Sequence, residues 1–99
     1  GLPGYGEAPF SISSPPHQEG SVDFCIRVVG NLTTALHGLT KGDCMWIRGP
    51  FGRGFPVDEM KGKDVLFIAG GIGLVPMRSL IKTVLSERSA FGRLTLLYG

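Results

Sequence analysis

The chain has 99 residues, of which 42% are hydrophobic and 18% are charged, and its formal net charge is +2. A charged fraction below the roughly 25% of an average soluble domain argues against disorder, and a small positive charge carried by scattered bases argues against a nucleic-acid-binding protein. No apolar run reaches the roughly 18 residues that a membrane span needs. We therefore expect a packed globular chain with no membrane span.

The opening stretch, GLPGYGEAPF, has no basic region followed by an apolar one, so the sequence predicts no signal peptide. Cys25 and Cys44 lie in apolar, strand-like surroundings, where a free cysteine usually behaves as a small buried hydrophobic residue. We expect two buried free thiols and a cytoplasmic location, because reduced thiols are typical of reducing compartments.

Short strand-like segments separated by turns occupy the first part of the chain. Residues 10–13 are β-prone and run into two prolines, residues 22–29 alternate from one face to the other, and residues 44–48 are again mostly apolar. One or two helical turns are predicted within residues 33–39. Residues 49–56 are predicted to be a loop, because they are rich in glycine and proline.

The pattern changes after Gly62. Residues 65–69 form a continuous apolar run, which is typical of a strand buried on both faces of a parallel sheet. A helical stripe follows, in which Pro76 suits the first turn, and Gly92 ends the helix before a second strand at residues 93–98. This order predicts strand–helix–strand, the start of a parallel α/β unit. The stripe consists of Met77, Leu80, Ile81, Val84 and Leu85.

Neither half has the features of a complete domain. A few short strands leave open sheet edges, and a single strand–helix–strand unit leaves a sheet face uncovered. We therefore expect a piece of a longer protein that spans a domain junction near residue 60.

Three glycines and a proline fill the junction between the apolar run and the helix: Gly70, Gly71, Gly73 and Pro76. A helix N terminus presents unpaired N–H groups and a partial positive charge, and glycine lets a diphosphate approach the backbone. The simpler alternative is a sharp turn without a ligand. A Walker-type loop is excluded, because no Gly-Lys-Ser/Thr follows.

A second junction of the same kind lies at Gly30, where a strand-like run ends and a short helix begins. Thr33 or Thr34 either caps this helix or leaves its N–H groups free for a second phosphate. The residues alone leave both alternatives open.

The sequence contains no readable catalytic dyad or metal site. His17 follows two prolines and His37 lies in the short helix, and neither has an acidic partner at a readable spacing. The His, Cys and Met residues form no metal-ligand pattern. Trp46 is expected in the core. A solvated surface position is expected for the arginines that could meet a phosphate, which are Arg27, Arg48, Arg53 and Arg78.

In their order along the chain, these motifs resemble those of the ferredoxin–NADP reductase-like flavoprotein superfamily. Residues 8–11 (APFS) are similar to its barrel motif R-x-[YF]-[ST], residues 30–33 (GNLT) to its phosphate motif G-x-x-[ST], and residues 39–43 to L-x-x-G-D. Residues 49–52 (GPFG) and 70–76 (GGIGLVP) resemble its later loops. Within the superfamily, the chain looks most like the gamma subunits of multisubunit hydrogenases and the electron-transfer subunits of sulfite reductase and dihydroorotate dehydrogenase.

The resemblance implies a mixed β and α/β fold. Residues 1–60 would be part of an antiparallel flavin-binding β-barrel, and residues 61–99 the first βαβ unit of a parallel-sheet NAD(P)-binding domain. It also implies an oxidoreductase subunit that moves hydride between NAD(P)H and FAD and passes electrons to an iron–sulfur or other redox partner subunit. A 2Fe–2S cluster would lie elsewhere in a longer parent protein, because two cysteines cannot supply four ligands.

For the flavin ring, the resemblance implies two catalytic residues, Phe10 and Ser11. Phe10 would pack on the ring, and Ser11 would hydrogen-bond near N5, the atom that exchanges hydride. The backbone groups of Ile12 and Ser13 would meet the ring edge. No general acid or base is required, because hydride transfer is the chemistry of the cofactors.

The remaining cofactor-binding residues are implied to lie in three loops. They are Gly30, Thr33 and Thr34 for the FAD diphosphate; Gly49, Pro50, Phe51 and Gly52 for the passage between the cofactors; and Gly70, Gly71, Gly73 and Pro76 for the nicotinamide nucleotide.

One position departs from the family pattern. Ala8 stands where the barrel motif carries an arginine that reaches the flavin diphosphate, and the acidic Glu7 lies beside it. This departure keeps a second hypothesis open, a non-catalytic nucleotide-binding or scaffolding module of the same fold from which flavin has been lost.

Overall fold

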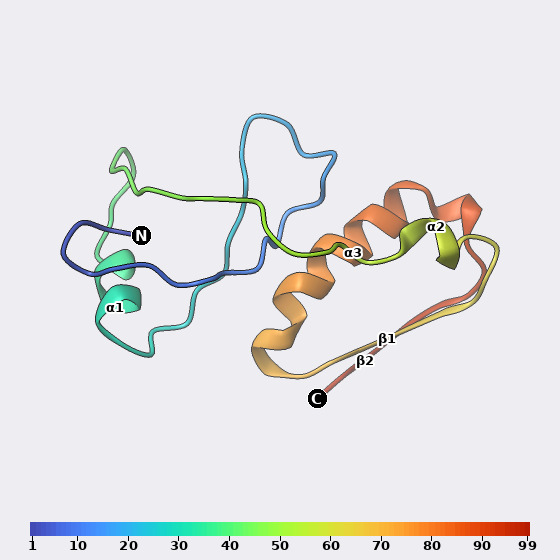
Figure 1. The fold of residues 1–99 in the computed structure, drawn as a ribbon. Helices are drawn as coiled ribbons and strands as arrows, with labels where there is room; N and C mark the ends of the chain where they lie inside the picture. Colours follow the sequence, from blue (N-terminus) through green and yellow to red (C-terminus); the bar gives the residue numbers. More distant parts are fainter. The chain divides into compact units, whose positions relative to one another are not determined.

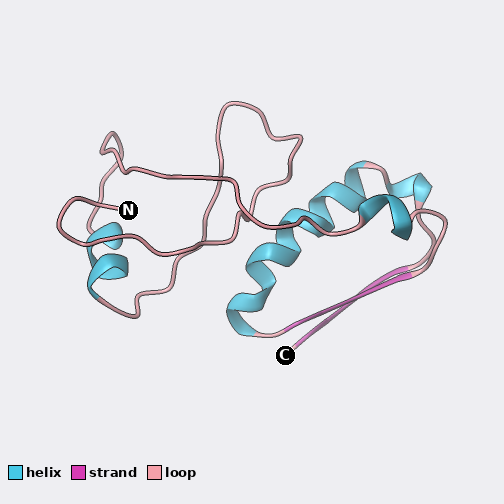
Figure 2. Ribbon diagram, in the orientation of Figure 1, coloured by secondary structure: helices cyan, strands magenta, loops and turns pink.

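The computed structural model describes residues 1–99, and the chain packs as two units. The first unit contains Gly1–Phe10 and Ile26–Arg53, and the second contains Ser11–Cys25 and Gly54–Gly99. None of the helices has the combination of length and apolar character that crossing a bilayer requires. The elements, drawn in Figures 1 and 2, are α1 (Asn31–His37), α2 (Val57–Met60), β1 (Val65–Ala69), η1 (Gly71–Gly73), α3 (Leu74–Ser86), η2 (Arg88–Ala90) and β2 (Leu94–Tyr98).

The second unit contains the predicted strand–helix–strand. β1 and β2 pair in parallel, with Val65 opposite Leu94 and Ala69 opposite Tyr98, and α3 forms the crossover that a parallel pair needs (Figure 2). The helix begins at Leu74, two residues before the predicted first turn. Pro76 is tolerated there, because the first four N–H groups of a helix have no partner within it.

The core of the second unit lies where α3 packs on one face of β1. It consists of Phe67 from β1, Leu80 and Val84 from α3, and Phe91 after η2. The spacing of Leu80 and Val84, one helical turn apart, places both on the stripe that the sequence predicted. This hydrophobic contact fixes the helix against the strand that leads into the glycine loop.

Only one face of β1 is buried in this chain, as expected for a single strand–helix–strand unit, which leaves a sheet face uncovered. Phe67 is only 4% exposed, but Leu66 is 54% exposed and Ile68 is 64% exposed. Successive side chains of a strand point to opposite faces, and α3 covers only one of them. A continuous apolar run indicates that both faces are apolar, but it cannot show that two layers are present.

The predicted strands at residues 10–13, 22–29 and 44–48 are not regular strands in the structure. A single antiparallel bridge joins Ile12 to Phe24, and the Ser13 N–H donates to the Asp23 carbonyl at 2.9 Å. Strand formation depends on pairing with neighbouring strands more than on intrinsic preference. The alternation of apolar and polar residues in these segments was therefore not enough to predict where strands pair. The β-barrel of residues 1–60 and the domain boundary near residue 60 stay predictions.

The short helix and the loop of the first half are confirmed. α1 begins at Asn31, two residues before the predicted range, and residues 49–56 contain neither helix nor strand. Cys25 and Cys44 are free as predicted, but both are exposed, so their predicted burial is wrong. Trp46 is 76% exposed and does not lie in the core. Both errors have one cause, since apolar sequence neighbours do not reveal which segments find a packing partner.

Candidate functional site

The glycine loop between β1 and α3 combines one glycine that the backbone requires with two that it does not. Gly71 has φ +52°, which only glycine adopts readily, so it serves the turn. Gly70 has φ −137° and Gly73 has φ −60°, which any residue adopts. A Cβ at Gly73 would meet nothing within 4 Å, and a Cβ at Gly70 would make only an ordinary contact, 3.5 Å from the Gly99 carbonyl oxygen. The turn therefore explains one of the three glycines.

The start of α3 has the electrostatic character of an anion site. No side chain caps it, and its first turn contains no acidic residue. The aligned peptide dipoles place a partial positive charge there. The Gly73 N–H donates to the Gly70 carbonyl, and the Leu74 N–H to the Gly71 and Ile72 carbonyls. What fits a phosphate group here is the open space left by the missing Cβ atoms beside this partial positive charge.

The loop is braced from the end of β2. The Gly71 N–H donates to the Gly99 carbonyl at 3.3 Å, and the Tyr98 hydroxyl donates to the Gly71 carbonyl at 3.1 Å. The Gly73 N–H donates to the Gly70 carbonyl at 2.9 Å. These bonds hold the loop in shape without using the space above Gly73.

At the second junction, Thr33 fastens the turn before α1. Its buried hydroxyl accepts the N–H groups of Val29 at 2.8 Å and Gly30 at 2.9 Å, and it donates to the Gly30 carbonyl at 3.1 Å. Thr33, the third residue of α1, thus bonds the backbone N–H groups that precede the helix, as in one half of a capping box, and no side chain caps the first N–H groups of α1 itself. Thr34 is exposed, and a Cβ at Gly30 would meet nothing within 4 Å. Thr33 therefore fixes the turn, and the groups that stay open to a ligand are the Thr34 hydroxyl and the backbone at Gly30.

The four residues of the ring-edge segment, Phe10 to Ser13, differ in what they leave accessible. Phe10 is half-buried in the first unit, and Ser11 and Ile12 are exposed in the second. The N–H and carbonyl of Ile12 make no hydrogen bond within the chain. Ser13 is only 5% exposed, and its N–H, carbonyl and hydroxyl are all engaged internally. Ser11 and Ile12 thus remain open to a ligand, whereas Ser13 is held by the protein.

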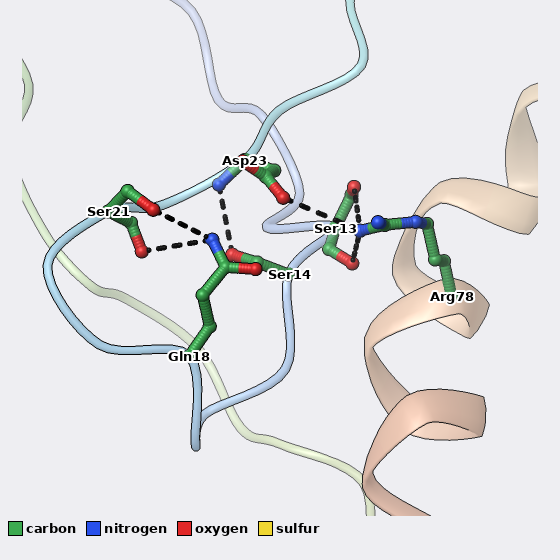
Figure 3. A network of polar contacts seen from close by, with 6 residues as sticks. All are labelled: Ser13, Ser14, Gln18, Ser21, Asp23 and Arg78. Carbon is green, nitrogen blue, oxygen red and sulfur yellow. Dashed lines mark hydrogen bonds and ion pairs between the residues drawn. The ribbon is translucent and has the colours of Figure 1, made fainter. Parts of the chain in front are cut away.

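Arg78 is the group that holds Ser13, and 41% of its side chain remains exposed, in keeping with the predicted surface position. As Figure 3 shows, it reaches from α3 to Ser13. Its Nη1 donates to the Ser13 carbonyl at 2.8 Å and to the Ser13 hydroxyl at 3.2 Å, and it lies 3.7 Å from the Asp23 carboxylate. The sequence carried no signal for this contact, because its two residues lie 65 positions apart.

The GPFG loop, residues 49–52, contains two glycines in the left-handed region, Gly49 with φ +143° and Gly52 with φ +85°. Pro50 and Phe51 between them are exposed. The guanidinium of Arg48 lies over the Phe51 ring, 5.6 Å from its centroid. The loop therefore presents an aromatic face beside a cation.

Arg48 also forms an ion pair with Glu7, the residue next to Ala8. The hydrogen bond from Arg48, and then its charge, hold the pKa of the Glu7 carboxyl below its usual value. The same bond raises the pKa of Arg48. Sequence gave no hint of this pair, because its members are 41 positions apart.

The predicted site residues fall into two sets, one in each unit. No group of three or more His, Cys, Asp or Glu side chains is placed to hold a metal ion. The first-unit set is Phe10, Gly30, Thr33, Thr34, Gly49, Pro50, Phe51 and Gly52, and the second-unit set is Ser11, Ile12, Ser13, Gly70, Gly71, Gly73 and Pro76.

Comparison with known proteins identifies the family. Residues 7–55 match the oxidoreductase FAD-binding domain. The chain belongs to this family. The matched residues include Phe10 and Ser11, the Gly30 junction and the GPFG loop, so the whole first-unit set and the whole ring-edge segment, residues 10–13, lie inside this FAD-binding domain.

Individual relatives confirm the predicted resemblance to flavoprotein subunits. The chain is 45% identical to sulfhydrogenase 1 subunit gamma of Pyrococcus furiosus over 96 residues, which is 97% of this chain and 33% of that protein. It is 43% identical to a probable dihydroorotate dehydrogenase B (NAD(+)) electron transfer subunit of Methanothermobacter thermautotrophicus, over 75% of this chain and 27% of that protein. It is 39% identical to the reductase component of phenol 2-monooxygenase from Pseudomonas sp., over 99% of this chain and 28% of that protein.

The chain spans about a third of the length of the curated relatives it matches first. No solved structure matches it.

Proposed function

We propose that the chain is part of an FAD-dependent oxidoreductase subunit that moves hydride between NAD(P)H and flavin and delivers electrons to a redox partner subunit. The observation that carries the proposal is the pair of glycines, Gly70 and Gly73, which no internal contact or backbone angle requires and which lie at the start of α3, where no side chain caps the helix. Membership of the FAD-binding family supports the flavin half. The relatives, which are enzyme subunits and a reductase component, support the partner subunit.

Phe10, Ser11 and Ile12 are the residues proposed to meet the flavin ring. Phe10 offers an aromatic face for stacking, Ser11 an exposed hydroxyl, and Ile12 an N–H and a carbonyl without partners in the chain. When bound, FAD supplies hydride acceptance and the release of single electrons. The protein supplies orientation and excludes water, so Ser13 acts only by holding Ser11 and Ile12 in place.

The FAD diphosphate is assigned to the Gly30 junction. Gly30 leaves room for an oxygen beside the backbone, Thr34 offers an exposed hydroxyl, and Thr33 keeps the turn in shape. With Ala8 in place of an arginine, affinity rests on backbone N–H groups rather than on a guanidinium. Flavin binding should consequently depend only weakly on ionic strength.

The nicotinamide nucleotide is assigned to the loop at α3. Gly71 makes the turn, Gly70 and Gly73 provide the open backbone, and Pro76 lies where a helix needs no N–H. Residues 49–52, with the exposed Phe51, are assigned to the passage between the two cofactors.

The test is the absorption spectrum of the purified protein after incubation with excess FAD and gel filtration. Flavin retained at about one per chain supports the proposal, and bleaching of its visible band by NADH or NADPH under anaerobic conditions supports the hydride step. A protein that circular dichroism shows to be folded but that retains no flavin would overturn it. That result would favour the alternative that Ala8 keeps open, a nucleotide-binding or scaffolding module without flavin.

A further inference from the structure

The hydrogen bonds of Arg78 join α3 to the segment around Ser13, which lies far from it in the sequence (Figure 3). Arg78 lies on α3, the helix that starts at the glycine loop, and Ser13 belongs to the ring-edge segment. The contact is bifurcated, since the single guanidinium nitrogen Nη1 donates to both the carbonyl and the hydroxyl of Ser13. Both residues lie in the second unit.

Ser13 is fixed from its other side as well. Its N–H donates to the Asp23 carbonyl at 2.9 Å, the Asp23 N–H donates to the Ser14 hydroxyl at 2.9 Å, and Ile12 bridges Phe24. Ser13 and Ser14 are both buried. A displacement of Arg78 would therefore move residues 12–14 together with residues 23–24, to which they are hydrogen-bonded, and not the Ser13 side chain alone.

We call the contacts of Arg78 with Ser13 and Asp23 the Arg78 clamp. The distance along α3 between Arg78 and the glycine loop shows what this clamp controls. Arg78 follows Gly73 by five residues, which is about 7.5 Å along the helix axis. Ser11 and Ile12, the open members of the ring-edge segment, directly precede Ser13 in the chain. The glycine loop and the open ring-edge groups are thus attached to the same helix within about two turns.

From this geometry we propose that Arg78 is a positioning residue that sets the separation between the ring-edge groups of Ser11 and Ile12 and the nucleotide loop at Gly70–Gly73. The inference rests on the proposed function. Arg78 touches neither cofactor in this role, and it acts through Ser13. Because hydride transfer needs its reacting atoms about 3–3.5 Å apart, a shift of roughly 1 Å lowers the rate on the order of 100-fold.

The variants are Arg78→Gln, Arg78→Lys and Asp23→Asn, with Lys82→Gln as the matched control. Lys82 is exposed on the same helix, and its side chain makes no ion pair or hydrogen bond. Arg78→Lys keeps the charge but replaces the guanidinium with an ammonium nitrogen at the end of a different stem. Asp23→Asn keeps the backbone bonds to Ser13 and Ser14 while removing one charge. Asp23→Asn carries the test if circular dichroism shows that Arg78→Gln does not fold.

The first readout needs no cofactor. Amide hydrogen exchange at Ser13 and Asp23 should speed up in Arg78→Gln by about tenfold or more, while exchange at Val65, which donates to the Arg93 carbonyl at 2.8 Å, should not change. An unchanged exchange rate at Ser13 would refute the proposal that Arg78 holds this segment in place. Equal acceleration at Val65 would also overturn it, because that result means general destabilisation.

The second readout separates positioning from binding. In the flavin-loaded protein, Arg78→Gln should lower the rate of flavin reduction at saturating NADH or NADPH by about 10- to 100-fold. The affinity for FAD and the half-saturating nucleotide concentration should change by less than roughly threefold. Arg78→Lys should recover part of the rate, Asp23→Asn should lose about two- to fivefold, and Lys82→Gln should match the parent.

The two proposals fail in different ways. If the parent protein retains no flavin, the proposed function falls and the positioning role falls with it, whatever the exchange data show. If the parent is reduced normally and Arg78→Gln is reduced at the same rate, only the positioning role is refuted. A loss confined to FAD affinity would make Arg78 a binding determinant and would equally refute it.

Discussion

Replacing Gly73 with alanine should stabilise the folded protein and at the same time weaken its binding of the nicotinamide nucleotide. Gly73 lies at the start of α3 with φ −60° and ψ −15°, an ordinary helical conformation. A Cβ there would meet nothing within 4 Å. Alanine costs less conformational entropy than glycine, so Gly73→Ala should raise the free energy of unfolding by about 0.5–1 kcal/mol.

For a chain of this size, that gain corresponds to an increase in melting temperature of about 2–8 °C. Thermal unfolding of the cofactor-free protein, followed by circular dichroism at 222 nm, measures it. The same variant should bind NADH or NADPH at least about tenfold more weakly, because the new methyl group occupies the space proposed for a phosphate. Isothermal calorimetry with each nucleotide measures this loss.

The matched control is Gly71→Ala in the same loop. With φ +52° at Gly71, alanine should destabilise the protein by about 1–2 kcal/mol through backbone strain alone. If Gly73→Ala is neutral or destabilising, the loop needs that glycine internally and the argument for a ligand fails. If the variant is stabilised and binds nucleotide as well as the parent does, the open space is not the binding cradle.

Three further predictions concern the fold and its charges. Gly92→Ala should cost about 1–3 kcal/mol in a urea titration, because its Cβ would clash with the Asp64 carboxylate and lie 3.2 Å from the Asp64 backbone nitrogen; an unchanged midpoint would refute this. Thr33→Val removes a buried hydroxyl that accepts two N–H groups, so it should cost about 1–2 kcal/mol by the same titration, and a smaller loss would mean that water replaces it. NMR titration of Glu7 should give a pKa below the usual value of a glutamate, and this pKa should rise in Arg48→Gln. The ion pair stabilises the fold above the unfolded pKa, and this contribution is lost as the pH falls through the lower folded pKa, so an unshifted pKa would contradict the pairing.

The sequence predicted the elements whose signals are local. The apolar run of β1 and the helical stripe of α3 are each contained in a few residues or turns. β1 has its predicted bounds and α3 begins two residues before its predicted first turn, but α3 ends at Ser86, well before Gly92, where the helix was expected to end. The glycine loop could be located for the same reason. Its division into one turn glycine and two open glycines required the backbone angles, which no sequence pattern carries.

What depends on distant partners could not be predicted. Residues 22–29 alternate well, yet they form no regular strand, because a ladder needs a neighbour that the alternation does not specify. Arg78 looks like any surface arginine until Ser13, 65 positions away, is placed against it. The exposure of Trp46 has the same origin, since composition does not indicate which apolar side chains find cover.

The interleaving of the two units has a consequence for how the chain acquires its structure. The path passes from one unit to the other after Phe10, after Cys25 and after Arg53. The contacts among β1, α3 and β2 are close in sequence and can form early, whereas the Arg78–Ser13 contact closes a loop of 65 residues and carries a larger entropic cost. The ring-edge segment should therefore be among the last parts to become ordered, so that the protein completes its proposed flavin site only after its nucleotide loop is in place.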